Sequence, residues 1–189
     1  MGKLTFILGG ARGGKSSLAQ KLAVEKGLPV LYIATAQALD EEMEHRIQVH
    51  RQERPQDWTT MEMPSSVAQS LNTGHVQSGV ILLDCLTMLV TNVMLAAAGN
   101  IETPDETQAE TNVRAEVDAL LSQIQSGQAD WIVVSNEVGM GLVPPYPVGR
   151  LFRDLLGWAN QRLATVANEV FWMVAGIPVP IQQFRASGN

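Results

Sequence analysis

The sequence predicts an α/β fold: a mostly parallel sheet with helices on both faces. Five runs of strand length are apolar throughout rather than alternating, which is typical of parallel strands covered on both sides. Segments with helical spacing separate these runs, and this alternation favours right-handed crossovers between parallel strands. The 189 residues, 46% apolar and 17% charged, suit one folded domain spanning residues 1–189.

The first half of the chain provides three of the predicted strands, at 4–8 (LTFIL), 30–34 (VLYIA) and 80–84 (VILLD). A helix is predicted over 17–26, where Leu18, Ala19, Leu22 and Ala23 recur at helical spacing. Segment 40–52 is charged and begins with the acidic turn DEE, which favours a helix start. Segment 86–98 is apolar nearly all round, so a buried helix is expected there.

The second half continues the alternation. Segment 100–110 is polar and contains Pro104, so we expect a surface excursion without regular structure. Amphipathic helices are predicted over 111–125 and 148–167, and strands over 131–135 (WIVVS) and 170–175 (VFWMVA). No internal repeat or linker divides the chain.

Charge and cysteine content narrow the class of protein. A net charge of −6 and a pI near 5.0 disfavour non-specific binding to nucleic acid. Cys85 is the single cysteine, which excludes an intramolecular disulfide and fits a reducing compartment. The apolar run 4–8 is too short for a secretory signal, and polar residues such as Asp84 and Asn92 interrupt the apolar stretch 80–98. We therefore expect a cytoplasmic protein with no membrane or nucleic-acid partner.

A glycine-rich loop follows the first strand. GGARGGKS, residues 9–16, satisfies the P-loop pattern G-x-x-x-x-G-K-[ST] with a strand before it and a helix after it. Backbone N–H groups can surround phosphate oxygens only where side chains do not intrude, hence the glycines. Lys15 would reach the terminal phosphates, and Ser16 would offer its hydroxyl to Mg²⁺. A simple glycine turn would explain the glycines but not the Lys-Ser pair, so a P-loop NTPase-like (RecA-like) nucleotide site is predicted.

Asp84 closes the buried strand VILLD, at the sheet edge where such folds bind ligands. A carboxylate there would be the second group that anchors Mg²⁺, through ordered water. The alternative is that Asp84 caps the helix that follows.

A basic cluster surrounds one histidine in the predicted helix 40–52 and just after it. Arg46 and His50 are four residues apart and share a helical face, and Arg51 and Arg54 follow closely. Three arginines around an imidazole form an anion site and disfavour a charged ring, which keeps the ring nucleophilic. The alternative is a solvated histidine on a charged helix. His45 faces another direction and is predicted to lie on the surface.

Several stretches together resemble one family across almost the whole chain. They are GGARGGKS (9–16), LYIATAQALDEEMEHRIQVHRQERPQDWTTME (31–62), LLDCLTMLVTN (82–92), SNEVGMGLVPPYPVGRLFRDLLGWANQRLA (135–164) and VAGIPV (174–179). The chain resembles the bifunctional adenosylcobinamide kinase/adenosylcobinamide-phosphate guanylyltransferases of cobalamin biosynthesis. The patterns R-I-x-x-H-R-x-x-R-P-x-x-W and N-E-V-G-x-G-x-V-P are the most restrictive.

The resemblance implies site residues. The family's histidine nucleophile, which carries GMP covalently, falls on His50. The implied nucleotide-binding residues are Gly9, Gly10, Ala11, Arg12, Gly13, Gly14, Lys15, Ser16, Ala34, Thr35, Ala36, Arg51, Gln52, Glu53, Arg54, Glu62 and Asp84. Gly13 stands where the family usually has Ser; because backbone N–H groups bind the phosphates, we expect nucleotide binding to survive.

The resemblance also implies substrates and assembly. Adenosylcobinamide would be phosphorylated, with GTP or ATP as donor, and its phosphate would then accept GMP from GTP. A homo-oligomer, specifically a trimer, is implied as well. Segment 136–147 follows a strand and is rich in Gly and Pro, so it is either an acceptor-side loop or a structural turn. An ordinary P-loop kinase without the covalent step, or a nucleotide-binding switch, are the competing interpretations.

Overall fold

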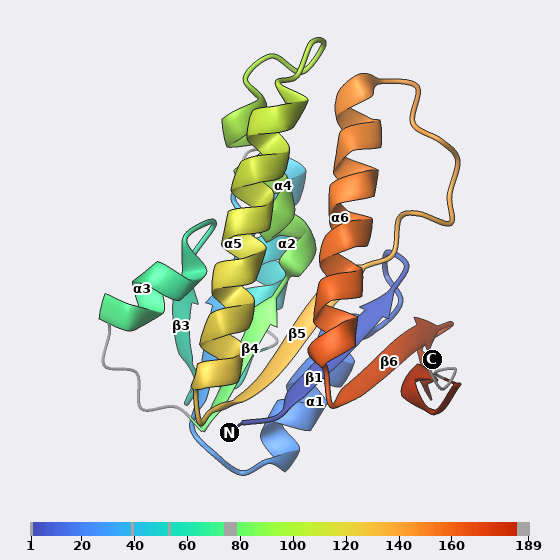
Figure 1. Ribbon diagram of the computed structural model, residues 1–189. Helices are drawn as coiled ribbons and strands as arrows, with labels where there is room; N and C mark the ends of the chain where they lie inside the picture. Colours follow the sequence, from blue (N-terminus) through green and yellow to red (C-terminus); the bar gives the residue numbers. More distant parts are fainter. Residues whose placement is uncertain (1, 39, 53, 74–78, 185–189) are drawn as a thin grey trace.

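A seven-stranded sheet forms the centre of the fold in the computed structural model, which describes residues 2–38, 40–52, 54–73 and 79–184 (Figure 1). The strands are β1 (Leu4–Gly9), β2 (Val30–Ala34), β3 (Thr59–Glu62), β4 (Val80–Asp84), β5 (Asp130–Asn136), β6 (Glu169–Val174) and β7 (Ile177–Pro180). Their order across the sheet is β3-β2-β4-β5-β1-β6-β7. Neighbouring strands are parallel except β6 and β7, which pair antiparallel.

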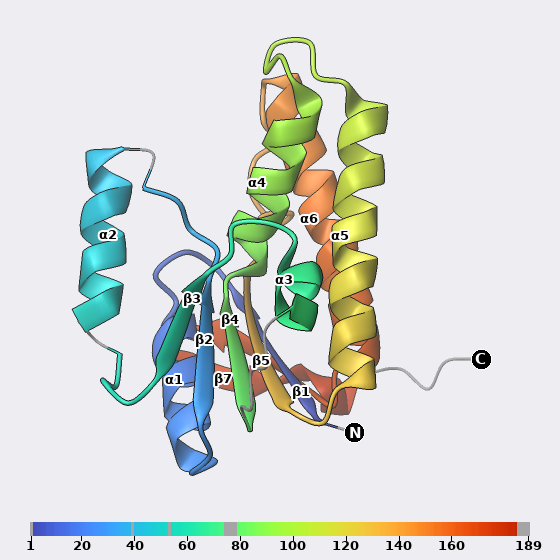
Figure 2. The same cartoon turned by 90° about the vertical axis from the view of Figure 1, so that its left-hand side faces the viewer.

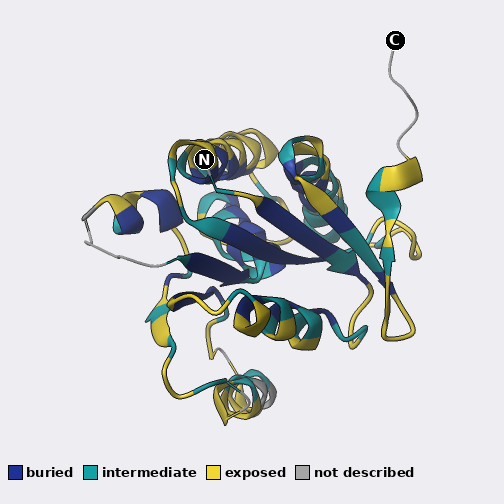
Figure 3. Ribbon diagram, turned by 90° about the horizontal axis from the view of Figure 1, so that it is seen from below, coloured by how far each residue is buried: buried dark blue, intermediate teal, exposed yellow. Residues whose placement is uncertain are grey.

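Helices cover both faces of this sheet, as predicted. They are α1 (Lys15–Glu25), α2 (Glu41–Gln52), α3 (Val67–Thr73), α4 (Leu86–Ala98), α5 (Glu106–Ser126) and α6 (Pro147–Val166), with a short 3₁₀ turn at Ile181–Phe184. The larger core lies between the sheet and α3–α6, and a smaller core lies between the sheet and α1 (Figure 3). Successive side chains of a strand point to opposite faces, so Phe6 enters the larger core and Ile7 the smaller one.

Helix α2 stands apart from the other helices (Figure 2). Asp40 caps its start, accepting a hydrogen bond from the Met43 N–H at 2.7 Å, as its acidic first turn suggested. None of the described helices is long and apolar enough to cross a membrane.

The five predicted strands are all present, but two short edge strands were not predicted. β3 has mostly exposed side chains, and β7 (IPVP) contains two prolines. Neither shows a strand pattern, and proline is tolerated in β7 because that strand lies at the edge of the sheet. The expected excursion over 100–110 is wrong in part. Helix α5 already begins at Glu106, because Asp105 caps it by accepting from the Gln108 N–H at 2.9 Å.

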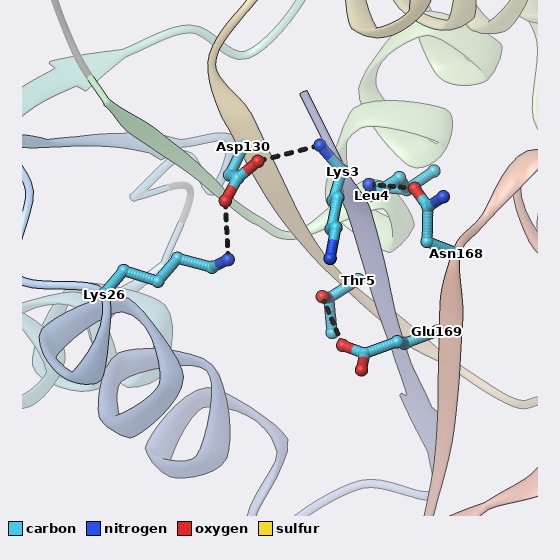
Figure 4. A network of polar contacts seen from close by, with 7 residues as sticks. All are labelled: Lys3, Leu4, Thr5, Lys26, Asp130, Asn168 and Glu169. Carbon is cyan, nitrogen blue, oxygen red and sulfur yellow. Dashed lines mark hydrogen bonds and ion pairs between the residues drawn. The ribbon is translucent and has the colours of Figure 1, made fainter. Parts of the chain in front are cut away.

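Polar contacts fasten the amino-terminal ends of β1, β5 and β6 (Figure 4). Asp130 accepts the Lys3 backbone N–H at 2.8 Å and the Lys26 ammonium at 2.6 Å, and the Asn168 side chain accepts the Leu4 N–H at 2.8 Å. Burial alone would raise the pKa of Asp130, but the hydrogen bonds from Lys26 and Lys3 outweigh it and lower that pKa. These contacts lie at the end of the sheet opposite the candidate site, so they serve stability.

Candidate active site

A cleft of about 870 Å³ opens at the carboxyl ends of the parallel strands, between the glycine loop and α2. Parallel α/β sheets commonly place ligands at this edge. The cleft is lined by Ala11, Arg12, Gly13, Gly14, Lys15, Ser16, Ser17, Tyr32, Ala34, Ala36, Gln37, Ala38, Met43, Glu44, Ile47, Gln48, Val49, His50, Arg51, Arg54, Glu62, Pro64, Asp84, Cys85, Met88, Val134 and Asn136. Most of the predicted site residues therefore lie around one cavity.

The glycine loop connects β1 to α1 and adopts a shape that depends on its glycines. Gly14 has a left-handed φ of 84° immediately before α1 begins at Lys15. A Cβ at Gly13 would lie 3.0 Å from the carbonyl oxygen of Gly10, so any side chain there would require the loop to shift by a few tenths of an ångström. The loop thus presents backbone to the cleft at the positive end of the α1 dipole.

Lys15 is 8% exposed, which is rare for a lysine. Its ammonium donates a hydrogen bond to the Gly10 carbonyl at 2.6 Å. Burial lowers the pKa of Lys15, and the nearby Cys85 and Asp84 partly oppose that shift. A buried cation that lines a cleft and donates to a neutral acceptor, the Gly10 carbonyl, is suited to bind an incoming anion.

Asp84 ends β4 and is held by Tyr32, whose hydroxyl donates to Asp84 Oδ2 at 2.8 Å. Helix α4 begins after Cys85 without a side-chain cap, so Asp84 does not play the capping role that was the alternative. Thr35 is fully buried; its hydroxyl donates to the Cys85 carbonyl at 2.7 Å and accepts the Cys85 N–H at 2.8 Å. Burial raises the pKa of the Cys85 thiol to about 11, so this thiol stays neutral.

Seven of the described residues of α2 line the cleft: Met43, Glu44, Ile47, Gln48, Val49, His50 and Arg51. His45 is exposed and does not line it. The structure does not describe the Arg46 side chain, so the three-arginine cluster is described only at Arg51 and Arg54.

The remaining predicted residues differ in their placement. An ion pair joins the side chains of Arg51 and Glu62 across the outer edge of the cleft. Gly9, Gly10, Thr35 and Gln52 do not line the cleft, and Glu53 lies outside the described residues. Thr35 instead supports the backbone that follows Asp84.

Tyr32 and Asn136 are two polar cleft residues that the sequence analysis did not include in the nucleotide site, although Asn136 begins the segment 136–147 that it singled out. Asn136 ends β5 as Asp84 ends β4, so the same pattern of a polar residue closing a buried strand could have found it. The Asn160 side chain donates to the Asn136 carbonyl at 3.0 Å, and Thr87 accepts the Asn136 N–H at 2.8 Å. Tyr32 could have been noticed as the one hydroxyl-bearing residue in VLYIA.

Comparison with known proteins decides the family. Residues 5–181 match the model of the CobU family, described as cobinamide kinase / cobinamide phosphate guanyltransferase. The chain belongs to this family. It is 41% identical to a bifunctional adenosylcobalamin biosynthesis protein, CobU, of Escherichia coli (strain K12), over 95% of this chain and 99% of that protein. The corresponding protein of Pseudomonas aeruginosa, CobP, is 42% identical over 94% of this chain and 96% of its own length.

Solved structures agree on the fold. A protein from Pyrococcus horikoshii OT3 superposes with a TM-score of 0.55 at 9% identity, covering 95% of this chain and 85% of that one. The resemblance found in the motifs is therefore confirmed at the level of family and fold. The chain is a bifunctional kinase and guanylyltransferase of cobinamide, and guanylyl transfer implies GTP as a substrate.

Proposed function

We propose that this cobinamide kinase and cobinamide phosphate guanylyltransferase carries out both reactions in the one cleft, and that a covalent GMP–His50 intermediate separates them. The observation that carries the proposal is that His50 lines the same cavity as the P-loop residues, whereas His45 does not. The acceptor is adenosylcobinamide in this proposal, and GTP or ATP serves as the phosphoryl donor.

In the kinase step the glycine loop and Lys15 hold the β- and γ-phosphates. The cobinamide hydroxyl attacks the γ-phosphorus, the bond from γ-phosphorus to the bridging oxygen breaks, and the nucleoside diphosphate leaves. No protein nucleophile is required. The hydroxyl proton passes to solvent.

In the transferase step a ring nitrogen of His50 attacks the α-phosphorus of GTP, and pyrophosphate leaves as the α–β bridging bond breaks. GMP is then held as a phosphoramidate. A phosphate oxygen of cobinamide phosphate attacks the same phosphorus, the P–N bond breaks, and the imidazole is regenerated. Arg51 and Arg54 line the cleft and are suited to stabilise the charge on the departing pyrophosphate.

The residues around the glycine loop fit a magnesium ion. Ser16 and Asp84 would hold it together with phosphate oxygens and water, as Mg²⁺ binds through few protein ligands. Bound Mg²⁺ would neutralise charge on the phosphates during transfer. Among the described residues no three acidic, histidine or cysteine side chains cluster as a dedicated metal site, so the nucleotide would complete the coordination.

The acceptor side is assigned to the segment that follows β5. Its Glu137 N–H donates to the Gly9 carbonyl at 3.1 Å, which places the start of the segment beside the glycine loop. Met140 is 75% exposed and Leu142 is 97% exposed, an apolar surface suited to the large corrin ring. The Arg150 guanidinium stabilises the segment by donating a hydrogen bond to the Pro145 carbonyl at 2.8 Å. A homotrimer is also proposed, on family resemblance, and light scattering would test it.

Labelled GTP tests the covalent mechanism. With α-labelled GTP, the wild-type protein should gain an acid-labile, base-stable label. With γ-labelled GTP, the label should appear on cobinamide. His50→Ala should lose the protein-bound label and guanylyl transfer but keep phosphorylation, because γ-transfer needs no protein nucleophile. His45→Ala is the control on the same helix and should keep both activities. A label retained in His50→Ala but lost in His45→Ala would refute the mechanism.

A further inference from the structure

Tyr32 contacts two separate parts of the cleft with two different parts of its side chain. Its hydroxyl donates to Asp84, and its ring lies under the guanidinium of Arg54. We propose that Tyr32 is a positioning residue that orients Asp84 for the metal-bound nucleotide and anchors the end of α2 that carries His50. This inference rests on the proposed roles of Asp84 and His50 and assigns a third residue to the same site.

Packing alone does not account for the Tyr32 hydroxyl. Tyr32 is 1% exposed and belongs to the smaller core, together with aliphatic residues such as Val80 and Leu82 of the neighbouring strand β4. A phenylalanine or leucine would fill such a place, and a buried tyrosine hydroxyl needs a partner.

The strand register explains why this partner is Asp84. Tyr32 pairs with Leu82 and Ala34 pairs with Asp84 between the parallel strands β2 and β4. Leu82 and Asp84 are two residues apart, so they point to the same face as Tyr32, and the long tyrosine side chain reaches the diagonal position. With Oδ2 committed to the hydroxyl, rotation of the Asp84 carboxylate is restricted.

The ring provides a buried anchor for the end of α2. Arg54 Cζ lies 3.7 Å from the centroid of the Tyr32 ring. The centroid of the Trp58 ring lies 6.4 Å from that of the Tyr32 ring. Arg54 Nε is buried and has no hydrogen-bond partner among the described residues. The guanidinium plane of Arg54 is instead stabilised by its cation–π contact with the Tyr32 ring. The ion pair of Arg51 with Glu62, near the same end of α2, is half-exposed and correspondingly weak.

Tyr32 thus joins the metal side of the cleft to the histidine side. Arg54 lies four residues after His50, just beyond the end of α2, so displacement of Arg54 would move the last turn of the helix. Removing the hydroxyl removes the hydrogen bond to Asp84, whereas removing the ring also removes the surface on which the Arg54 guanidinium lies. The two functions can therefore be separated by two substitutions at one position.

The test compares Tyr32→Phe with Tyr32→Leu, and Tyr146→Phe makes the same chemical change at an exposed tyrosine as control. Binding of a fluorescent GDP analogue is titrated with Mg²⁺, and the α-labelled GMP adduct is measured at saturating Mg²⁺. Tyr32→Phe should raise the Mg²⁺ concentration for half-maximal binding about fivefold and keep most of the adduct. Tyr32→Leu should raise it equally and also slow adduct formation about tenfold. Tyr146→Phe should match the wild type in the Mg²⁺ titration.

A double-mutant cycle protects the test against general destabilisation of Tyr32→Leu. Arg54→Met should slow adduct formation in the wild-type background and have a smaller effect in Tyr32→Leu, because the part of its effect that depends on the Tyr32 ring is already lost there. Additive effects would overturn the anchoring role, and a wild-type Mg²⁺ requirement in Tyr32→Phe would overturn the orienting role. If wild-type protein takes no α-label, the covalent mechanism fails, while the Mg²⁺ titration still decides whether Tyr32 orients Asp84.

Discussion

Replacing Lys15 with methionine should separate ligand binding from folding. Methionine keeps most of the buried aliphatic length but removes the charge. A hydrogen bond to a charged group contributes about 1.5–3 kcal/mol, so nucleotide affinity should fall about 10- to 150-fold. Without nucleotide, the ammonium donates a hydrogen bond to the Gly10 carbonyl at 2.6 Å. Lys15→Met should lower both activities because the variant binds the nucleotide phosphates less tightly.

The effect on stability should have a different sign. Burial lowers the pKa of Lys15 in the folded protein, so its charged form is disfavoured there relative to the unfolded chain. For such a base the unfolding free energy rises as pH rises towards the unfolded pKa, and at neutral pH the charge is a destabilising contribution. Lys15→Met removes this contribution. The unfolding free energy of the nucleotide-free variant should therefore lie within about 1 kcal/mol of the wild-type value, or above it.

Urea unfolding without nucleotide and titration with a fluorescent GTP analogue measure the two quantities. Lys21→Met is the matched control, because Lys21 lies in the same helix with a side chain that is 72% exposed. Lys21→Met should change neither the unfolding free energy nor the nucleotide affinity. A Lys15→Met protein that binds nucleotide as well as wild type but has lost more than about 2 kcal/mol of stability would refute the reasoning. Lys15 would then be a structural residue of the loop.

Three further substitutions test other parts of the molecule. Asp84→Asn keeps the shape but removes the charge, so nucleotide binding should need more Mg²⁺; an unchanged requirement in a less stable protein would indicate a purely structural carboxylate. Asp130→Asn should lower the unfolding free energy by about 1 kcal/mol at neutral pH through its contact with Lys26. Because the folded pKa of Asp130 is lowered, this contribution is present above about pH 4 and lost below it, so a gap that persists in acid would contradict the assignment. Leu142→Asn should raise the KM for cobinamide several-fold, and an unchanged KM would place the corrin ring elsewhere.

The sequence predicted the fold and much of the site because both have local signals. Apolar runs identify buried parallel strands wherever they occur, and GGARGGKS gives the loop its shape through its own glycines. The bounds of α4 matched the prediction because an apolar segment begins and ends sharply there. β3 and β7 were missed because each pairs on one side only and needs no continuous apolar pattern.

The sequence by itself determined which residue types were available: a phosphate loop, a carboxylate closing a strand, and a histidine on a charged helix. Only the tertiary structure decided which of them meet. Tyr32 and Asp84 are 52 positions apart, and their hydrogen bond exists because the register of β2 and β4 places them diagonally on one face. His50 and Lys15 share a cleft because α2, in the connection between β2 and β3, lies opposite the glycine loop. Such contacts depend on strand pairing and packing over long sequence separations, and no local pattern encodes them.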